Sequence, residues 1–130
     1  MPIRLCALVS APILALTVAI SGVPQRTVAA GDSDEATVSP EVLEMGQALY
    51  KKNCRLCHGT KGTSGKPLAG NEMVESADYM AHVILTGPGY MAAFADALSD
   101  EEIALIITYV RNSWGHAYGP VDAALVAEMR

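Results

Sequence analysis

The C-x-x-C-H sequence at residues 54–58 constrains this chain more than any other feature. Cys54 and Cys57 are separated by two residues, and His58 follows the second cysteine directly. On a helix this spacing sets the two sulfurs about one turn apart. The chain has one more cysteine, Cys6, and an odd total of three does not indicate a disulfide framework. The pair at positions 54 and 57 therefore needs another chemical role.

The first 30 residues have the pattern of an export signal. They contain no acidic residue, their only charges are Arg4 and Arg26, and an apolar run covers residues 5–20 before the sequence Val-Ala-Ala. This pattern is typical of a secretory signal peptide, with cleavage expected after Ala30. The run is short for a bilayer-spanning helix of about 20 residues, so an uncleaved membrane anchor is the less favoured interpretation. We expect a periplasmic protein with no membrane span after cleavage.

Export limits what the cysteine pair can be, because free thiols do not stay idle in an oxidising compartment. A zinc site needs two further ligands, and His82 and His116 lie 34 residues apart with no second cysteine pair. A thioredoxin-like dithiol needs a βαβ context, and a disulfide across two residues is strained and leaves the histidine unexplained. C-x-x-C-H is the attachment sequence of c-type haem, in which each thiol adds to one vinyl group of the porphyrin. The sequence therefore predicts one covalently bound haem c on Cys54 and Cys57, with His58 as the proximal axial ligand of its iron.

Composition excludes two other classes of protein. The 130 residues include 9 Lys and Arg against 14 Asp and Glu, and the formal net charge is −5. That balance argues against a nucleic-acid binder, because no basic surface is large enough to neutralise many phosphates. A hydrophobic content of 51% is too high for a disordered acidic tail.

The mature chain reads as all-α with long loops. Ser39 and Pro40 are typical of a helix start, and Ser99 with Glu102 forms a capping box in front of an apolar run. Residues 59–70 are rich in glycine and lysine and indicate an irregular loop. The sequence predicts three to four short helices, at about 40–53, at 76–86, from the capping box to Trp114, and, as a short terminal helix, within 119–130.

Residues 39–115 resemble the class I c-type cytochromes, which are small soluble mono-haem proteins. Gly46 and Tyr50 lie at the family's four-residue spacing before Cys54, and residues 98–115 look like the last helix of bacterial periplasmic cytochromes, including dehydrogenase-associated ones. The resemblance implies a cytochrome c fold wrapped around the haem, with Gly46 and Tyr50 packed against an aromatic residue of the last helix, here Tyr109. A glycine inside a helix costs up to about 1 kcal/mol, and the close approach of two helices is a physical reason for it.

The resemblance also implies a methionine as the second axial ligand, from the loop before the last helix. Met91-Ala92-Ala93-Phe94 matches the family at the methionine and the phenylalanine, and departs from it at Ala92, where proline is common. Met91 is the expected distal ligand, and Met73 is the best alternative. The other methionines and histidines are not expected to bind the iron. Met45 is expected to fill the core, Met80 and His82 to take core or surface positions, and His116 to face water.

Further contacts follow from the same resemblance. The iron-bound histidine is expected to give its other ring N–H to a backbone carbonyl, that of Lys66 or Pro67. The haem walls are expected to be Leu68, Phe94 and Ile107. Two roles are equally favoured for Trp114 and Tyr118: each either bonds a haem propionate or packs in the core.

An iron with histidine and methionine ligands has no open position, which favours one-electron transfer over catalysis. The predicted function is that of a periplasmic electron carrier, either a soluble shuttle or the cytochrome subunit of a dehydrogenase, and not an enzyme in itself. The alternative is a haem enzyme or gas sensor with an open sixth position; a zinc-stabilised domain ranks third. The expected partners are redox proteins, namely a dehydrogenase or other donor and an oxidase or other acceptor.

Charge distribution bears on how such partners dock. Residues 51–66 hold five basic side chains and no acidic one: Lys51, Lys52, Arg55, Lys61 and Lys66. A patch of this kind steers an acidic partner toward the haem edge, although ordinary solvated lysines are an equally good interpretation. The whole chain then divides into a signal peptide (1–30), a flexible acidic terminus (31–38), a mono-haem domain (39–118) and an extension (119–130).

Overall fold

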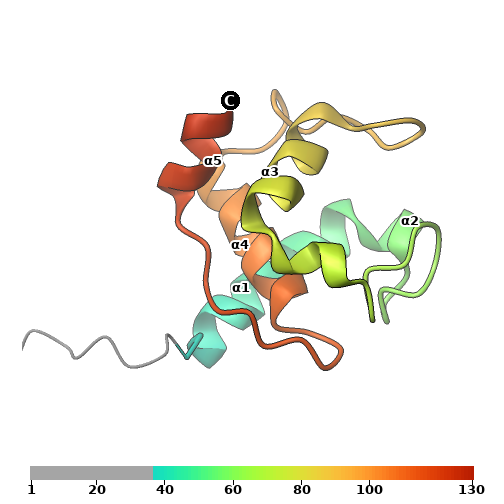
Figure 1. Ribbon diagram of the computed structural model, residues 1–130, viewed down its shortest axis with the longest axis vertical. Helices are drawn as coiled ribbons and strands as arrows, with labels where there is room; N and C mark the ends of the chain where they lie inside the picture. Colours follow the sequence, from blue (N-terminus) through green and yellow to red (C-terminus); the bar gives the residue numbers. More distant parts are fainter. Residues whose placement is uncertain (1–36) are drawn as a thin grey trace, which may run out of the picture. The chain divides into compact units, whose positions relative to one another are not determined.

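The structure is a computed structural model that describes residues 37–130. The predicted signal peptide, its cleavage point after Ala30 and the acidic terminus up to residue 36 lie outside the described residues. The described part contains no strand, which confirms the all-α prediction. Its helices, shown in Figure 1, are α1 (Pro40–Asn53), α2 (Arg55–His58), the 3₁₀ helix η1 (Glu72–Glu75), α3 (Ala77–Thr86), α4 (Asp100–Arg111) and α5 (Ala123–Met129).

The helix starts follow the capping residues that the sequence offers. The Ser39 hydroxyl accepts a hydrogen bond from the backbone N–H of Val42 at 3.3 Å and opens α1. At the start of α4, the Ser99 hydroxyl accepts from the Glu102 N–H at 3.2 Å, and the Glu102 carboxylate accepts from the Ser99 N–H at 3.0 Å. These bonds satisfy backbone donors that a helix leaves unpaired in its first turn.

The last predicted helix ends earlier than expected. We predicted that it continues to Trp114, but α4 stops at Arg111. The Asn112 side chain donates to the carbonyls of Thr108 and Gly119 at 2.7 and 2.9 Å, so it joins the helix end to the chain segment that returns alongside it. Trp114 has a φ of 54°, a left-handed conformation that a right-handed helix cannot contain.

Helices α1 and α4 cross in direct backbone contact at Gly46. A Cβ atom at this position would lie 2.3 Å from the Leu105 carbonyl oxygen and 2.7 Å from Cβ of Tyr109. One turn further along α1, the buried Tyr50 ring packs against Tyr109, with 5.3 Å between the ring centroids. The expected packing of Gly46 and Tyr50 against the last helix is therefore confirmed.

The core forms around α4, whose apolar face is almost wholly buried. Helices α3 and α5 and the 3₁₀ helix η1 all pack on it, and α5 also packs on α3. The largest fully buried aliphatic side chains are Val74, Ile103, Ile106, Ile107, Val110 and Val126. Helix α5 is the short terminal helix expected in residues 119–130. Within residues 37–130 no helix has the length and apolarity needed to cross a membrane.

Candidate functional site

The two cysteines of the C-x-x-C-H sequence lie on the turn between α1 and α2. Cys54 ends α1 and precedes α2, while Cys57 lies within α2, one turn later. Both are free thiols. Burial, together with the nearby Cys57, raises the pKa of the Cys54 thiol to about 11, whereas Cys57 is exposed. The helical turn thus presents two unpaired sulfurs at the spacing the sequence predicted.

The His58 ring is oriented by a backbone carbonyl. Its Nδ1 lies 3.0 Å from the Lys66 oxygen, one of the two carbonyls expected for this role. The loop between them is closed by a bond from the Ser64 N–H to the His58 carbonyl at 3.1 Å. Among the described residues, Nε2 of His58 has no hydrogen-bond partner. With Nδ1 engaged, Nε2 remains free to bind a metal ion.

The loop that carries Met91 starts where α3 ends. Gly87 adopts a left-handed conformation and terminates the helix. Further along, the Phe94 N–H donates to the Ile84 carbonyl at 3.0 Å, which ties the loop back to α3. The expected haem-wall residues and Met91 form an apolar set against the core: Leu68, Met91 and Phe94 are partly buried and Ile107 is fully buried.

The remaining methionines and histidines differ in their surroundings. Met80 is 6% exposed and belongs to the core, but Met45 is 44% exposed, so its predicted role as core filler is wrong. The contact of α1 with α4 is made by its neighbour Gly46 instead. Met73, the alternative ligand, is 49% exposed. We expected His116 to face water, but its Nε2 lies 3.2 Å from the Leu68 carbonyl and its ring stacks on Tyr118.

Trp114 takes the packing role that the sequence left open. Its ring lies 5.5 Å from Tyr50 and 5.8 Å from Tyr109 between centroids, both edge-on. It also covers Gly62, where a Cβ atom would come within 2.7 Å of the indole. The loop after α2 is thereby fastened to the crossing of α1 and α4. Tyr118 likewise packs, against His116.

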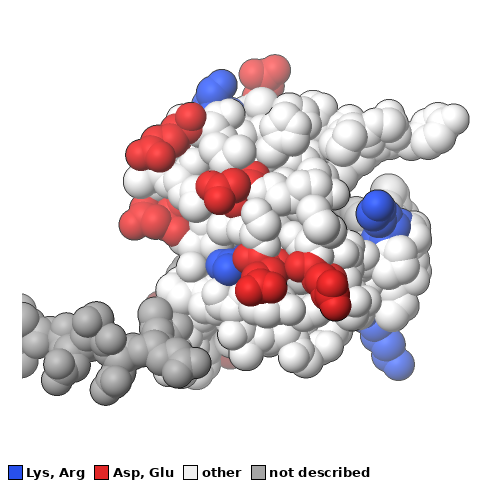
Figure 2. Space-filling view, viewed as in Figure 1, with Lys and Arg blue, Asp and Glu red and all other residues white. Residues whose placement is uncertain are grey.

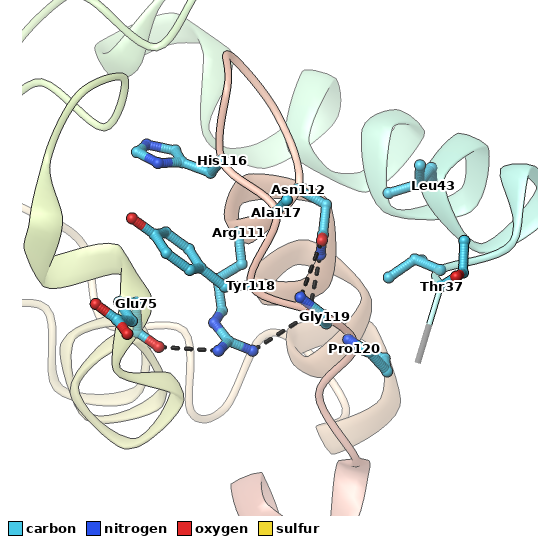
Figure 3. A pocket seen from close by; sticks show the side chains of 11 residues that line it. Thr37, Leu43, Glu75, Arg111, Asn112, His116, Ala117, Tyr118, Gly119 and Pro120 are labelled. Atoms are coloured by element: carbon cyan, nitrogen blue, oxygen red, sulfur yellow. Dashed lines mark hydrogen bonds between the residues drawn. The ribbon is translucent and has the colours of Figure 1, made fainter. Parts of the chain in front are cut away.

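One buried polar residue was missed in the sequence. Arg111 donates from Nη2 to the Glu75 carbonyl at 2.9 Å and from Nη1 to the Gly119 carbonyl at 3.2 Å (Figure 3). Burial lowers the pKa of its guanidinium, and its Nε has no partner among the described residues. The signal was present in the spacing, since Arg111 follows Ile103 and Ile107 at four-residue intervals on the buried face of α4.

Arg111 lines an open pocket of about 740 Å³ on the side of η1 and the returning segment. Figure 3 shows the guanidinium between Glu75 and Gly119, next to the Tyr118 ring. The pocket's lining contains neither the C-x-x-C-H residues nor Met91. It is therefore separate from the candidate site, and Arg111 acts in it as a link between η1 and the segment after α4.

The zinc alternative finds no support in the described residues. Nowhere in residues 37–130 do three or more His, Cys, Asp or Glu side chains gather closely enough to hold a metal ion. A histidine beside two thiols, backed by apolar side chains, is a donor set for a porphyrin instead.

Comparison with known proteins identifies the family. Residues 41–110, more than half of the chain, match the family described as cytochrome C oxidase, cbb3-type, subunit III. The chain belongs to this family of c-type cytochrome domains. The protein thus has a cytochrome c fold and binds haem c covalently. The residues fit that group, because two unpaired thiols lie one turn apart beside an imidazole whose Nε2 is free, with apolar walls nearby.

Similar proteins include cytochrome subunits of dehydrogenases. The cytochrome c subunit of alcohol dehydrogenase (quinone) from Gluconobacter oxydans is 33% identical over 103 residues, covering 65% of this chain and 22% of the relative. The gluconate 2-dehydrogenase cytochrome c subunit of Pantoea cypripedii is 29% identical over 106 residues, covering 67% and 24%. Cytochrome c6 of Bryopsis maxima is 30% identical over 77 residues, covering 52% and 88%. The chain spans about a fifth to a quarter of the two dehydrogenase subunits.

Proposed function

We propose that this protein is an exported one-electron carrier whose haem is attached to Cys54 and Cys57 and ligated by His58 and Met91. Its family and its relatives support electron transfer in general. The observation that carries the finer proposal is the contact between His58 Nδ1 and the Lys66 carbonyl at 3.0 Å, which orients the ring and leaves Nε2 for iron. A bound haem supplies the one-electron Fe(III)/Fe(II) couple.

The protein's own residues then decide how the couple is used. The Lys66 carbonyl keeps His58 in one tautomer, with the proton on Nδ1. Met91 comes from a loop tied to α3 through the Phe94 N–H, and its thioether would close the second axial position. A closed position excludes substrate, and a thioether ligand favours the reduced state more than a second nitrogen does.

Attachment is tested by the mass of the denatured protein after maturation in a haem-attaching host. The wild type should retain one haem covalently. Cys54→Ser and Cys57→Ser should each lose one thioether and, through it, most of the stable holoprotein. Cys6→Ser is the matched control, because Cys6 lies in the predicted signal peptide, and it should retain the haem. Full retention in Cys54→Ser would contradict the assignment.

Carbon monoxide separates the carrier from a haem enzyme or gas sensor. Added to the reduced protein, it should leave the absorption spectrum unchanged if the iron has two protein ligands. A spectrum that shifts at low carbon monoxide concentration would show an open sixth position, and the search would move to peroxide or gas chemistry.

We further propose that a redox protein with an acidic face docks over α2 and the loop after it. Figure 2 shows basic side chains gathered on that side, whereas acidic side chains lie over other parts of the same face. Leu56, between the two cysteines, is 96% exposed, and Tyr90 on the Met91 loop is fully exposed. Exposed apolar side chains together with basic ones suit a small, transient interface. Because two of the relatives are cytochrome subunits of dehydrogenases, we propose a dehydrogenase as the electron donor. The proposed electron acceptor is an oxidase or another redox protein.

Ionic strength tests the docking proposal. The rate of electron transfer with such a partner should fall about tenfold between 10 and 200 mM salt if steering operates. Lys52→Gln with Lys61→Gln should reduce both the rate and its salt dependence, while Glu128→Gln, which neutralises a single charge on α5, should change neither. A rate indifferent to salt would leave the lysines as ordinary surface charges.

Export is tested by fractionation and by the mass of the mature chain. We expect the holoprotein in the periplasmic fraction, with Gly31 as its first residue. Full-length protein held in the membrane fraction would indicate an uncleaved anchor.

A further inference from the structure

Helix α5 is docked along its length rather than free. The Asp122 carboxylate accepts from the Ala124 N–H at 2.8 Å and opens the helix. Val126 is fully buried against α3 and α4. Before the helix, the Val121 N–H donates to the Thr108 hydroxyl at 2.9 Å and fixes the returning segment to α4. Figure 1 shows α5 beside α3 and the segment that leads into α4.

At the end of α5, Arg130 uses all of its guanidinium nitrogens to bind Asp100, the first residue of α4, and the segment before it. Nε and Nη2 contact Asp100 Oδ1 at 2.8 and 2.7 Å. Nη2 also donates to the Leu98 carbonyl at 3.1 Å, and Nη1 donates to the Ala95 carbonyl. A guanidinium presents its donors in a planar fork, so one side chain can fix three acceptors in register.

The carbonyls that Arg130 binds belong to the exit of the Met91 loop. On the entry side the loop is closed at Gly87, where a Cβ atom would lie 2.3 Å from the Ala93 nitrogen. On the exit side the Leu98 N–H donates to the Phe94 carbonyl at 3.0 Å and closes a turn. The Ala95 and Leu98 carbonyls of this turn accept hydrogen bonds from Arg130. The loop is thus fastened at both ends, once by its own glycine and once by α5.

We propose that Arg130 is a positioning residue for Met91, acting through the backbone of residues 95–98, and that α5 is the strap that carries it. This inference rests on the proposed ligation of iron by Met91. An exposed ion pair with Asp100 contributes little by itself. The effect comes from the two carbonyls, because charge-assisted hydrogen bonds to backbone are the stronger kind. Releasing them lets the loop exit move and makes the methionine easier to displace.

The test uses the holoprotein and added imidazole, which displaces a methionine ligand and removes its far-red sulfur–iron absorption band. Arg130→Gln should bind imidazole about 3- to 10-fold more tightly than the wild type, as expected for the loss of charge-assisted bonds. Arg130→Lys, which keeps the charge and not the fork, should lie between them. Glu128→Gln, on the same helix, is the control and should match the wild type.

Amide hydrogen exchange gives a second readout that does not depend on iron. In Arg130→Gln the amides of Phe94 and Leu98 should exchange about 3- to 10-fold faster, while the amide of Cys54, at the end of α1, should not change. A merely structural role would lower resistance to urea and leave imidazole affinity and these local exchange rates as in the wild type. That result would overturn the positioning role of Arg130.

The two proposals fail in different ways. If the wild type lacks the sulfur–iron band, the ligation by Met91 is wrong, and the positioning role falls with it. If the wild type has the band and Arg130→Gln binds imidazole as the wild type does, the ligation stands and only the role of Arg130 is overturned.

Discussion

The imidazole Nδ1 of His58 lies 3.0 Å from the carbonyl oxygen of Lys66, eight residues further along the chain. The loop between them turns back at Gly65, which has a φ of +59° and would bring a Cβ atom within 2.9 Å of the Cys57 carbonyl oxygen. The conformation that orients the histidine thus depends on a glycine packed against the attachment turn. A hydrogen bond from Nδ1 to a carbonyl makes the other nitrogen a stronger ligand.

Gly65→Ala should disturb this orientation. The added methyl meets the Cys57 carbonyl, so we expect the Lys66 carbonyl to move away and the hydrogen bond to weaken. A weaker bond lowers the basicity of the ligand and favours the reduced state, which should raise the reduction potential by roughly 20–60 mV, since 59 mV is tenfold for one electron. Potentiometric titration measures it.

Gly70→Ala is the matched control for that change. Gly70 has a similar left-handed φ of +69°, but a Cβ atom there has no neighbour within 4 Å among the described residues. Both variants carry the backbone strain, and only the first moves the loop. Equal potentials in the two variants would show that the contact does not tune the iron.

Gly46→Ala should lower the free energy of unfolding by about 1–3 kcal/mol, the usual cost of overpacking. The reason is the contact of α1 with the Leu105 carbonyl and Tyr109, which leaves no room for a methyl group. Urea unfolding measures the change. Ala48→Gly, at an exposed position of the same helix, calibrates helix propensity and should cost about 1 kcal/mol. If Gly46→Ala instead gains that amount, the close approach is wrong.

Arg111→Ala should cost about 2–3 kcal/mol of stability, because the Glu75 and Gly119 carbonyls lose a charged donor and the buried stem is lost. Arg111→Lys should recover part of the loss, since an ammonium reaches fewer of the same acceptors. Denaturant titration checks both variants. Arg55→Ala, at an exposed position of α2, should stay within about 0.5 kcal/mol of the wild type. If Arg111→Ala and Arg55→Ala changed the stability equally, Arg111 would not link η1 to the segment after α4.

Tyr50 makes stability depend on pH in the alkaline range. Burial, with smaller contributions from Cys54 and Tyr109, raises its pKa from 10.0 to about 12, and burial remains once Cys54 is attached to haem. A raised pKa in the folded state means that the contribution is complete below pH 10 and is lost as pH rises toward 12. We expect a loss of about 1–2 kcal/mol over this window.

Tyr50→Phe isolates that dependence. At neutral pH it should cost about 1 kcal/mol through the hydroxyl's bond to the Gly59 carbonyl, which is 2.7 Å long. The difference in unfolding free energy between the wild type and the variant should then shrink from pH 10 to pH 12. A constant difference across the window would assign the alkaline loss to other groups.

Most of the fold could be predicted from short-range signals in the sequence. The start of α1 followed from Ser39 and Pro40, because a cap acts on the backbone next to it. Helix α3 ends at Thr86 as predicted but begins at Ala77, one residue later than predicted, because Ser76 caps the helix from outside. The end of α4 did not follow, since Asn112 stops the helix by binding Gly119, a contact that exists only after the returning segment has packed. Met45 was misplaced for a related reason, because its spacing fits a buried face but α4 approaches α1 through Gly46.

The candidate site was predictable where its chemistry is local. Cys54, Cys57 and His58 lie within five residues, and one helical turn determines their geometry. The orienting carbonyl of Lys66 came from the family resemblance. Arg111 and Arg130 were not found, because each binds carbonyls distant in sequence that only the folded chain brings close.

The most direct test of the account is the far-red absorption of the oxidised holoprotein. The wild type should show the weak sulfur–iron band together with a low-spin spectrum, and Met91→Ala should lose that band. Met73→Ala, which removes the more exposed alternative methionine, should keep it. A band that survives in Met91→Ala and vanishes in Met73→Ala, or a wild type without any such band, would contradict ligation by Met91.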